Sequence, residues 1–183
     1  MSRSSCLDAA LEYLARGWCA IPLCPPDHAG CSEEHVAHCP NAGAEPVIPW
    51  QTYRERLPRP MELQLFWTRY PQCNVGVVLG RVSKLVAVDL EGPEADDLLA
   101  QLLPGPLPPT LTLRTPAGER RLFFAIPPTL VVPRGRFDGP GCHVVVLGEG
   151  TYAALPPSVH LNGAIYSWNS SSPPPCPTGS PAG

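Results

Sequence analysis

The stretch LVAVDLEG, residues 85–92, sets two acids, Asp89 and Glu91, into a run that is otherwise typical of a core strand. Successive side chains of a strand point to opposite faces, so the two carboxylates share one face while Val86, Val88 and Leu90 face the core. Two carboxylates on one face repel each other unless a cation lies between them, and Mg²⁺ or Mn²⁺ commonly fills that role. A strand that simply ends in solvated acids is the competing interpretation, and the pair alone does not decide between them.

Helices and strands alternate around this stretch, and a run of strands follows it. Leucines and alanines at helical spacing predict a first helix over 7–14, with Ser5 and Asp8 as a capping box and Gly17 as its stop. Further helices are expected at 60–70 and 93–103. Strands are expected at 18–23, 74–80, 84–91, 110–115, 120–126, 143–147, 151–156 and 164–168. This order predicts an α+β fold.

Composition limits the class of protein. The 183 residues suit one domain with a real core, and 44% apolar with 16% charged residues is typical of a globular chain. The net charge of -3 gives no overall basic field, but five arginines could form a local basic groove: Arg114, Arg120, Arg121, Arg134 and Arg136. No apolar run is long enough for a membrane span, so a cytoplasmic protein is expected. The Pro/Ser/Gly-rich segment 169–183 is expected to be a disordered tail.

Cysteines and histidines concentrate in CPPDHAGCSEEHVAHC, residues 24–39, which holds three of each. In a cytoplasmic protein such cysteines are thiols or metal ligands rather than a disulfide framework. Zinc takes four nitrogen or sulfur ligands in a tetrahedron, and the predicted set is Cys24, Cys31, His35 and Cys39, with His28 or His38 as substitutes. Free thiols beside surface histidines are the alternative.

A second polar stretch is GEGTYAALPPSVHLNGAIYSW, residues 148–168, where Pro156 and Pro157 interrupt pairing and present Ser158 and His160. A hydroxyl and an imidazole beside a turn could hold a phosphate or a sugar. Equally, Ser158 could cap a turn and His160 could be a surface residue.

Together these segments resemble the bifunctional DNA primase/polymerase (Prim-Pol) domain of the archaeo-eukaryotic primase superfamily. The similarity covers about residues 7–168. It is carried by an ordered set of motifs: GWCAIPL, the Cys/His insert before PVIPW, FWTRYPQCNVGVVLG, LVAVDLEG, RRLFFAIP and the 148–168 stretch.

The resemblance implies an RRM-like catalytic sheet with an additional N-terminal α/β unit and a zinc-binding insert at 24–45, all within a domain of residues 1–168. It implies a nucleotidyltransferase that starts or extends strands in DNA replication, with DNA template and nucleoside triphosphates as partners and a separate helicase as a further one. Asp89 and Glu91 correspond to catalytic acids that bind Mg²⁺ or Mn²⁺. Arg121, Ser158 and His160 correspond to nucleotide-binding positions, and the zinc is structural.

Three departures from the family pattern keep other functions open. Gly43-Ala44-Glu45 stands where a Gly-Lys is common, Arg121 stands where a histidine usually precedes the strand, and Val145 stands where a third acid is expected. An arginine can bind phosphate, but with another geometry and without a titratable proton. A second hypothesis is therefore a catalytically inactive Prim-Pol fold that binds nucleotide or DNA. A third is a zinc-stapled interaction module.

Overall fold

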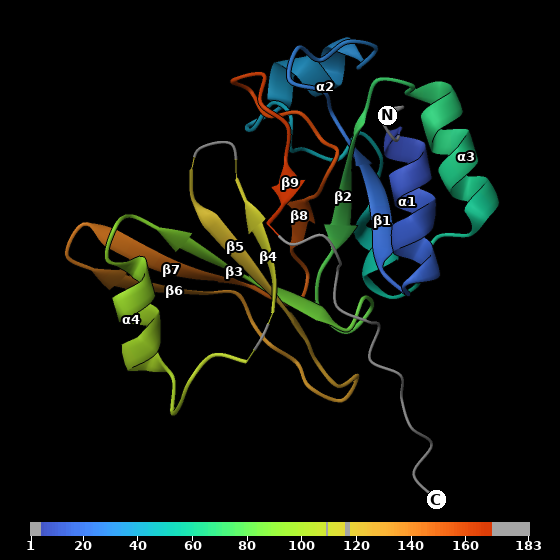
Figure 1. Ribbon diagram of the computed structural model, residues 1–183. Coiled ribbons are helices and arrows are strands. Elements are labelled where there is room, and N and C mark those ends of the chain that lie inside the picture. Colours follow the sequence, from blue (N-terminus) through green and yellow to red (C-terminus); the bar gives the residue numbers. More distant parts are fainter. Residues whose placement is uncertain (1–4, 109, 116–117, 170–183) are drawn as a thin grey trace, which may run out of the picture.

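Helices and two antiparallel sheets make up the computed structural model, which describes residues 5–108, 110–115 and 118–169 (Figure 1). The mixed architecture agrees with the α+β class expected from the sequence. The RRM-like arrangement and the domain limits 1–168 stay predictions. Of the predicted tail, all but Asn169 lies outside the described residues.

A three-stranded sheet with two helices forms the first unit. Its strands are β1 (Cys19–Leu23), β2 (Asn74–Val78) and β8 (Tyr152–Ala154), in the order β1-β2-β8. Helices α1 (Cys6–Ala15) and α3 (Pro60–Arg69) pack side by side against this sheet (Figure 1). The predicted capping box is confirmed, because Ser5 and Asp8 exchange hydrogen bonds at the start of α1.

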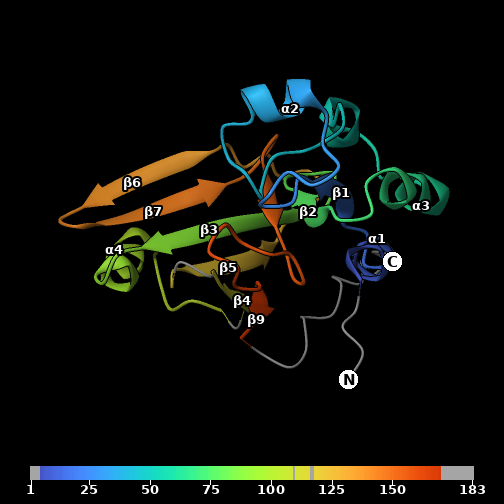
Figure 2. The same ribbon diagram turned by 90° about the horizontal axis from the view of Figure 1, so that it is seen from above.

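Six strands form the larger sheet, in the order β6-β7-β3-β5-β4-β9. Figure 2 shows the strands in this order, from one edge of the sheet to the other. The strands are β3 (Leu85–Glu91), β4 (Leu111–Arg114), β5 (Arg120–Ala125), β6 (Gly135–Gly139), β7 (Cys142–Leu147) and β9 (Ser167–Trp168). The stretch LVAVDLEG thus supplies a central strand, with β7 on one side and β5 on the other.

The two faces of β3 have different environments. Val88 and Leu90 lie in a small core under helix α4 (Ala95–Leu102), as the alternation predicts. Ala87, on the other face, belongs to the main core that the two sheets share. Towards the end of the strand this second face carries Asp89 and Glu91. Gly92 then turns the chain with φ +90°, at a point where a Cβ atom would lie 2.4 Å from the Gly141 oxygen.

Two strands differ from the expected pattern. Strand β6 was not expected, because GRFDG has no alternating apolar residues and its pairing with β7 supplies the order instead. The segment 164–168 contributes only the two-residue strand β9. The long loop after β1 contains a short helix, α2 (Glu33–His38), and a 3-10 turn, η1 (Gln51–Arg54). Across the described ranges, no helix combines the length and hydropathy that crossing a bilayer requires.

Candidate functional site

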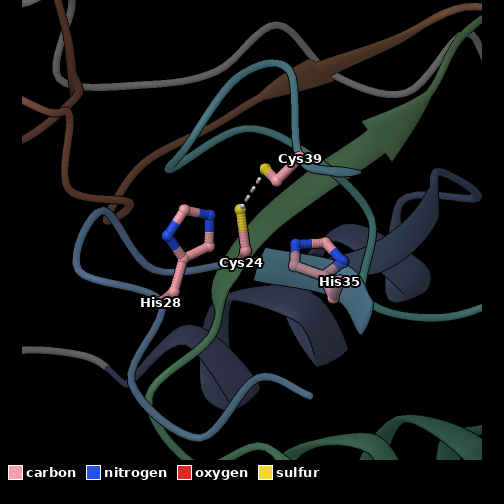
Figure 3. A group of neighbouring side chains, drawn as sticks. All are labelled: Cys24, His28, His35 and Cys39. Carbon is pink, nitrogen blue, oxygen red and sulfur yellow. Dashed lines mark hydrogen bonds between the residues drawn. The ribbon is translucent and has the colours of Figure 1, made fainter. Parts of the chain in front are cut away.

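Four potential metal ligands converge in the insert: Cys24, His28, His35 and Cys39 (Figure 3). Their ligand atoms all lie within 4.8 Å of one another. They come from separate pieces of backbone. Cys24 follows β1, His28 lies in a turn with φ 56°, His35 lies on α2, and Cys39 caps the end of α2.

The geometry of these four side chains suits a tetrahedral ion. The sulfur atoms of Cys24 and Cys39 are 3.8 Å apart. Two thiolates that share a zinc ion with Zn–S bonds of about 2.3 Å lie about 3.8 Å apart, whereas a disulfide would bring them to about 2.05 Å. The Nε2 atoms of His28 and His35 are buried without a hydrogen-bond partner among the described residues. Buried polar atoms normally have partners, so these two nitrogens are available to a metal ion.

Local electrostatics act on two of these ligands. Burial and then the nearby His28 ring lower the pKa of His35, which favours the neutral imidazole that a metal binds. Burial raises the pKa of the Cys24 thiol, while backbone N–H groups of Glu45 and Gly43 act in the opposite direction. The Gly43 N–H donates to the Cys24 sulfur at 3.3 Å. Such a donor would stabilise a thiolate at this position.

A buried asparagine fastens the insert to the sheets. The Nδ2 group of Asn74, at the start of β2, donates to the carbonyls of Gly43 and Val159, at 2.8 Å in each case. Its Oδ1 atom accepts from the Val159 N–H at 2.9 Å. Asn74 therefore joins the insert to the loop after β8. No sequence motif indicated this role, because the three segments are far apart in the chain.

Three of the four predicted zinc ligands, Cys24, His35 and Cys39, lie in the cluster. Cys31 lies outside it, and His28 takes the fourth place, a substitution that the spacing had left open. The turn explains the difference, because the N–H of Cys31 donates to the His28 carbonyl just before Ser32 starts α2. This turn brings the His28 ring to the cluster from the opposite side to His35 (Figure 3).

The acidic stretch has a different environment. In the antiparallel register, Asp89 lies opposite Arg121 of β5 on one side and opposite Val145 of β7 on the other. Directly opposed residues share a face of the sheet, with Cβ atoms about 4.5–5.5 Å apart. The cross-strand neighbours of Asp89 are therefore a cation and a hydrocarbon side chain. Val145 occupies the place where the family resemblance called for a third acid.

Asp89 and Arg121 form a bidentate ion pair. The Nε atom of Arg121 lies 2.5 Å from one carboxylate oxygen of Asp89, and its Nη2 atom lies 2.8 Å from the other. The two side chains are only 12% and 13% exposed, respectively. Burial by itself would lower the pKa of Arg121, but the Asp89 carboxylate raises it above the ordinary value. Arg121 therefore remains charged throughout the accessible pH range.

The residues around Asp89 do not fit a two-ion magnesium or manganese centre as they stand. Both oxygens of Asp89 hold Arg121, and Val145 offers no ligand atom. Glu91 lies opposite His143, whose Nδ1 atom is 2.7 Å from the Asp138 carboxylate, although the angle is not that of a hydrogen bond. Within the described residues, the Cys/His group alone brings three or more potential ligands together.

Ser158 is fully buried and is engaged with the backbone of β2. Its hydroxyl accepts from the N–H of Val75 at 2.9 Å and donates to the Val75 carbonyl at 2.8 Å. These two bonds fasten the loop after β8 to the sheet. A direct contact with a nucleotide stays a prediction for this residue.

Tyr166 lies near both His160 and Arg121. The His160 ring lies edge-on to the Tyr166 ring, with centroids 6.1 Å apart, and His160 lines a cleft of about 330 Å³ beside Pro25 and Asp27. Burial raises the pKa of Tyr166, while the charge of nearby Arg121 acts in the opposite direction. Arg121 and His160, two of the predicted nucleotide-binding residues, thus both lie near one buried ring.

Comparison with known proteins agrees with this arrangement of motifs. No curated protein matches the sequence. Residues 10–179 match the family described as Prim-Pol, the N-terminal domain of bifunctional DNA primase/polymerase proteins. That match spans every strand of both sheets, the Cys/His insert included, so the chain belongs to the Prim-Pol family.

Proposed function

We propose that this chain is a primase/polymerase-type domain that binds DNA and nucleoside triphosphates, and that it does so without two-ion nucleotidyl transfer. Membership of the Prim-Pol family supports the choice of ligands. The absence of two-ion transfer is inferred from the bidentate ion pair between Arg121 and Asp89, with Val145 in the neighbouring position. Two-ion transfer depends on carboxylates that are free to bridge cations, and Asp89 is not free.

The nucleotide site would lie on the polar end of the face that carries Asp89. Arg136 and His143, on β6 and β7, share this face and are partly or fully exposed. Tyr166 lies near Arg121, and His160 contacts the Tyr166 ring. Arginine and histidine side chains bind phosphate oxygens, and aromatic rings can stack on bases.

A metal-dependent nucleotidyltransferase active in DNA replication is the second candidate function. It is favoured by the position of Asp89 and Glu91 on one face of β3, where Glu91 is partly exposed and makes no ion pair among the described residues. Under this proposal the two acids are the catalytic residues and bind Mg²⁺ or Mn²⁺. It requires the Arg121 guanidinium to leave Asp89.

The insert would hold a structural Zn²⁺ ion under either candidate. Two thiolates and two imidazoles form a common ligand set for structural zinc, with all four positions filled by protein. Through Gly43 and Asn74, such an ion would stabilise the contact between the insert, β2 and the loop after β8. This role positions the domain's loops and supplies no chemistry to a substrate.

A paired binding and extension experiment tests the proposal. Fluorescence anisotropy with labelled single-stranded and primed DNA, at fixed salt, is expected to show binding by the wild-type protein. Primer extension and de novo priming with Mg²⁺ or Mn²⁺ are expected to yield no product. Product that disappears in both Asp89→Asn and Glu91→Gln but persists in Asp138→Asn would establish the second candidate. A folded protein that binds neither DNA nor nucleotide would instead favour an interaction module.

A further inference from the structure

We propose that Arg121 is the resident cation of the acidic site, so that the chain neutralises Asp89 itself and does not bind a divalent ion there. Arg121 Nε and Nη2 each meet one carboxylate oxygen of Asp89, at 2.5 and 2.8 Å. This bidentate geometry uses one lone pair of each carboxylate oxygen, on the side where a bidentate metal ion would bind. The inference deepens the proposed function, but it does not depend on DNA being the ligand.

A divalent ion cannot share Asp89 with this guanidinium at low cost. The two side chains are almost buried, and charges interact more strongly there than in water. A cation bound to either oxygen would lie within a few ångströms of a permanent positive charge. Arginine cannot release its proton to relieve that repulsion, whereas a histidine at the same position could.

The other side of Asp89 offers no second carboxylate that could offset the charge of Arg121. Val145 faces Asp89 directly across the β3–β7 pairing and is itself buried. The next position on the same face of β7 is His143, which lies opposite Glu91 rather than Asp89. No second carboxylate therefore reaches the space beside Asp89 from this strand, and the negative charge that would attract an ion is already balanced.

Arg121 has a third contact, which connects the two sheets. Its Nη1 atom lies 3.5 Å from the carbonyl oxygen of Ala154 on β8, in the three-stranded sheet. The guanidinium thus lies between Asp89 of the large sheet and the backbone of the small one. A metal ion would have to displace an interaction that also holds the sheets together, which further favours the built-in cation.

The test is Mn²⁺ binding by the zinc-loaded chain of 183 residues, measured by electron paramagnetic resonance and calorimetry. The wild type is expected to have no Mn²⁺ site that depends on Asp89. The double variant Arg121→Gln, Val145→Asp is expected to gain one site per chain, and adding Asp89→Asn should abolish it. The exposed substitution Arg136→Gln, which removes a cation from the same face, should produce no gain.

Two outcomes would overturn the inference. One is a wild-type protein that binds one Mn²⁺ ion and loses it on Asp89→Asn, because the ion would then coexist with Arg121. The other is a folded double variant without a site. If the double variant does not fold, the single variant Arg121→Gln is the test. The inference predicts that it binds Mn²⁺ at least about tenfold more tightly than any residual binding of the wild type, because one adjacent positive charge is lost. An unchanged affinity would overturn the inference. DNA binding by the wild type tests the proposed function separately.

Discussion

The residue types of the Cys/His cluster and of the acidic strand both suggest a metal site. Only the Cys/His cluster has side chains whose ligand atoms are available to a metal ion. In the cluster, two sulfur atoms 3.8 Å apart face two buried imidazole nitrogens that have no partner among the described residues. In the acidic strand, both oxygens of Asp89 already bind Arg121. The insert is therefore arranged to bind a cation, while the acidic strand already has one beside it, Arg121 of β5.

This difference shows that ligand type is a weaker criterion than the state of the ligand atoms. A carboxylate on a strand can bind a metal or an arginine, and the neighbouring strand determines which of them is present. The two buried imidazole nitrogens of the cluster, which have no hydrogen-bond partner among the described residues, have fewer alternatives, because leaving them unpaired is costly. The predictions below test this contrast, from the largest expected effect to the smallest.

Removal of one cluster ligand should have the largest effect. Cys24→Ser is expected to reduce bound zinc from about one ion per chain to none, and to lower the thermal midpoint by roughly 10 °C, because the folded state loses its metal. Elemental analysis and thermal denaturation measure both. The matched control is Cys31→Ser, next to the cluster but outside it. Zinc loss in the control would contradict the ligand set with His28.

Breaking the buried ion pair should have the next largest effect. Asp89→Ala is expected to lower the free energy of unfolding by about 3–5 kcal/mol, because it leaves the Arg121 charge buried without a partner. Urea denaturation of zinc-loaded protein provides the measurement. Asp138→Ala removes an acid that is 62% exposed, and should change the free energy of unfolding far less than Asp89→Ala does, because solvent screens exposed pairs. Similar losses in the two variants would show that Asp89 is not held as described.

Ser158→Ala separates a structural from a ligand-binding role. The substitution leaves the buried N–H of Val75 without its acceptor, so a loss of about 1–3 kcal/mol in unfolding free energy is expected. Ser167→Ala, at an exposed position of β9, serves as the control. A Ser158→Ala protein of unchanged stability but weakened nucleotide binding would assign the hydroxyl to the ligand instead.

The smallest effect is expected for the Arg56–Glu62 ion pair, a surface counterpart of the Asp89–Arg121 pair. Its contribution to the free energy of unfolding should depend on pH. Glu62 accepts from Arg56, from the Arg59 N–H and from Tyr53, and these bonds lower its pKa from 4.5 to about 2, with Arg56 as the largest cause. A lowered pKa in the folded state stabilises the fold above the usual pKa, and this contribution disappears as the pH falls from about 4.5 to 2. The stability difference between wild type and Glu62→Gln, followed by urea denaturation, should therefore shrink over that window. A difference that stays constant from pH 6 to pH 2 would contradict the assignment.

Most of the fold was predictable because its signals are local. The capping box at Ser5, the alternation in LVAVDLEG and the leucine spacing of α4 each act within a few residues. Strand β6 was missed because it has no such local signal and depends on its pairing with β7. The choice of His28 over Cys31 was equally out of reach, because a turn with φ 56° at His28 decides which side chain points inward.

The sequence by itself determined that Asp89 and Glu91 share a face, that cysteines and histidines are dense enough for a metal, and that the motif order is that of Prim-Pol. These properties follow from strand periodicity, composition and chain order. Only the tertiary structure decided that Arg121, 32 residues away in the chain, neutralises Asp89. Cross-strand register made that choice, because it determines which charges face each other and so whether a carboxylate remains free for a metal ion.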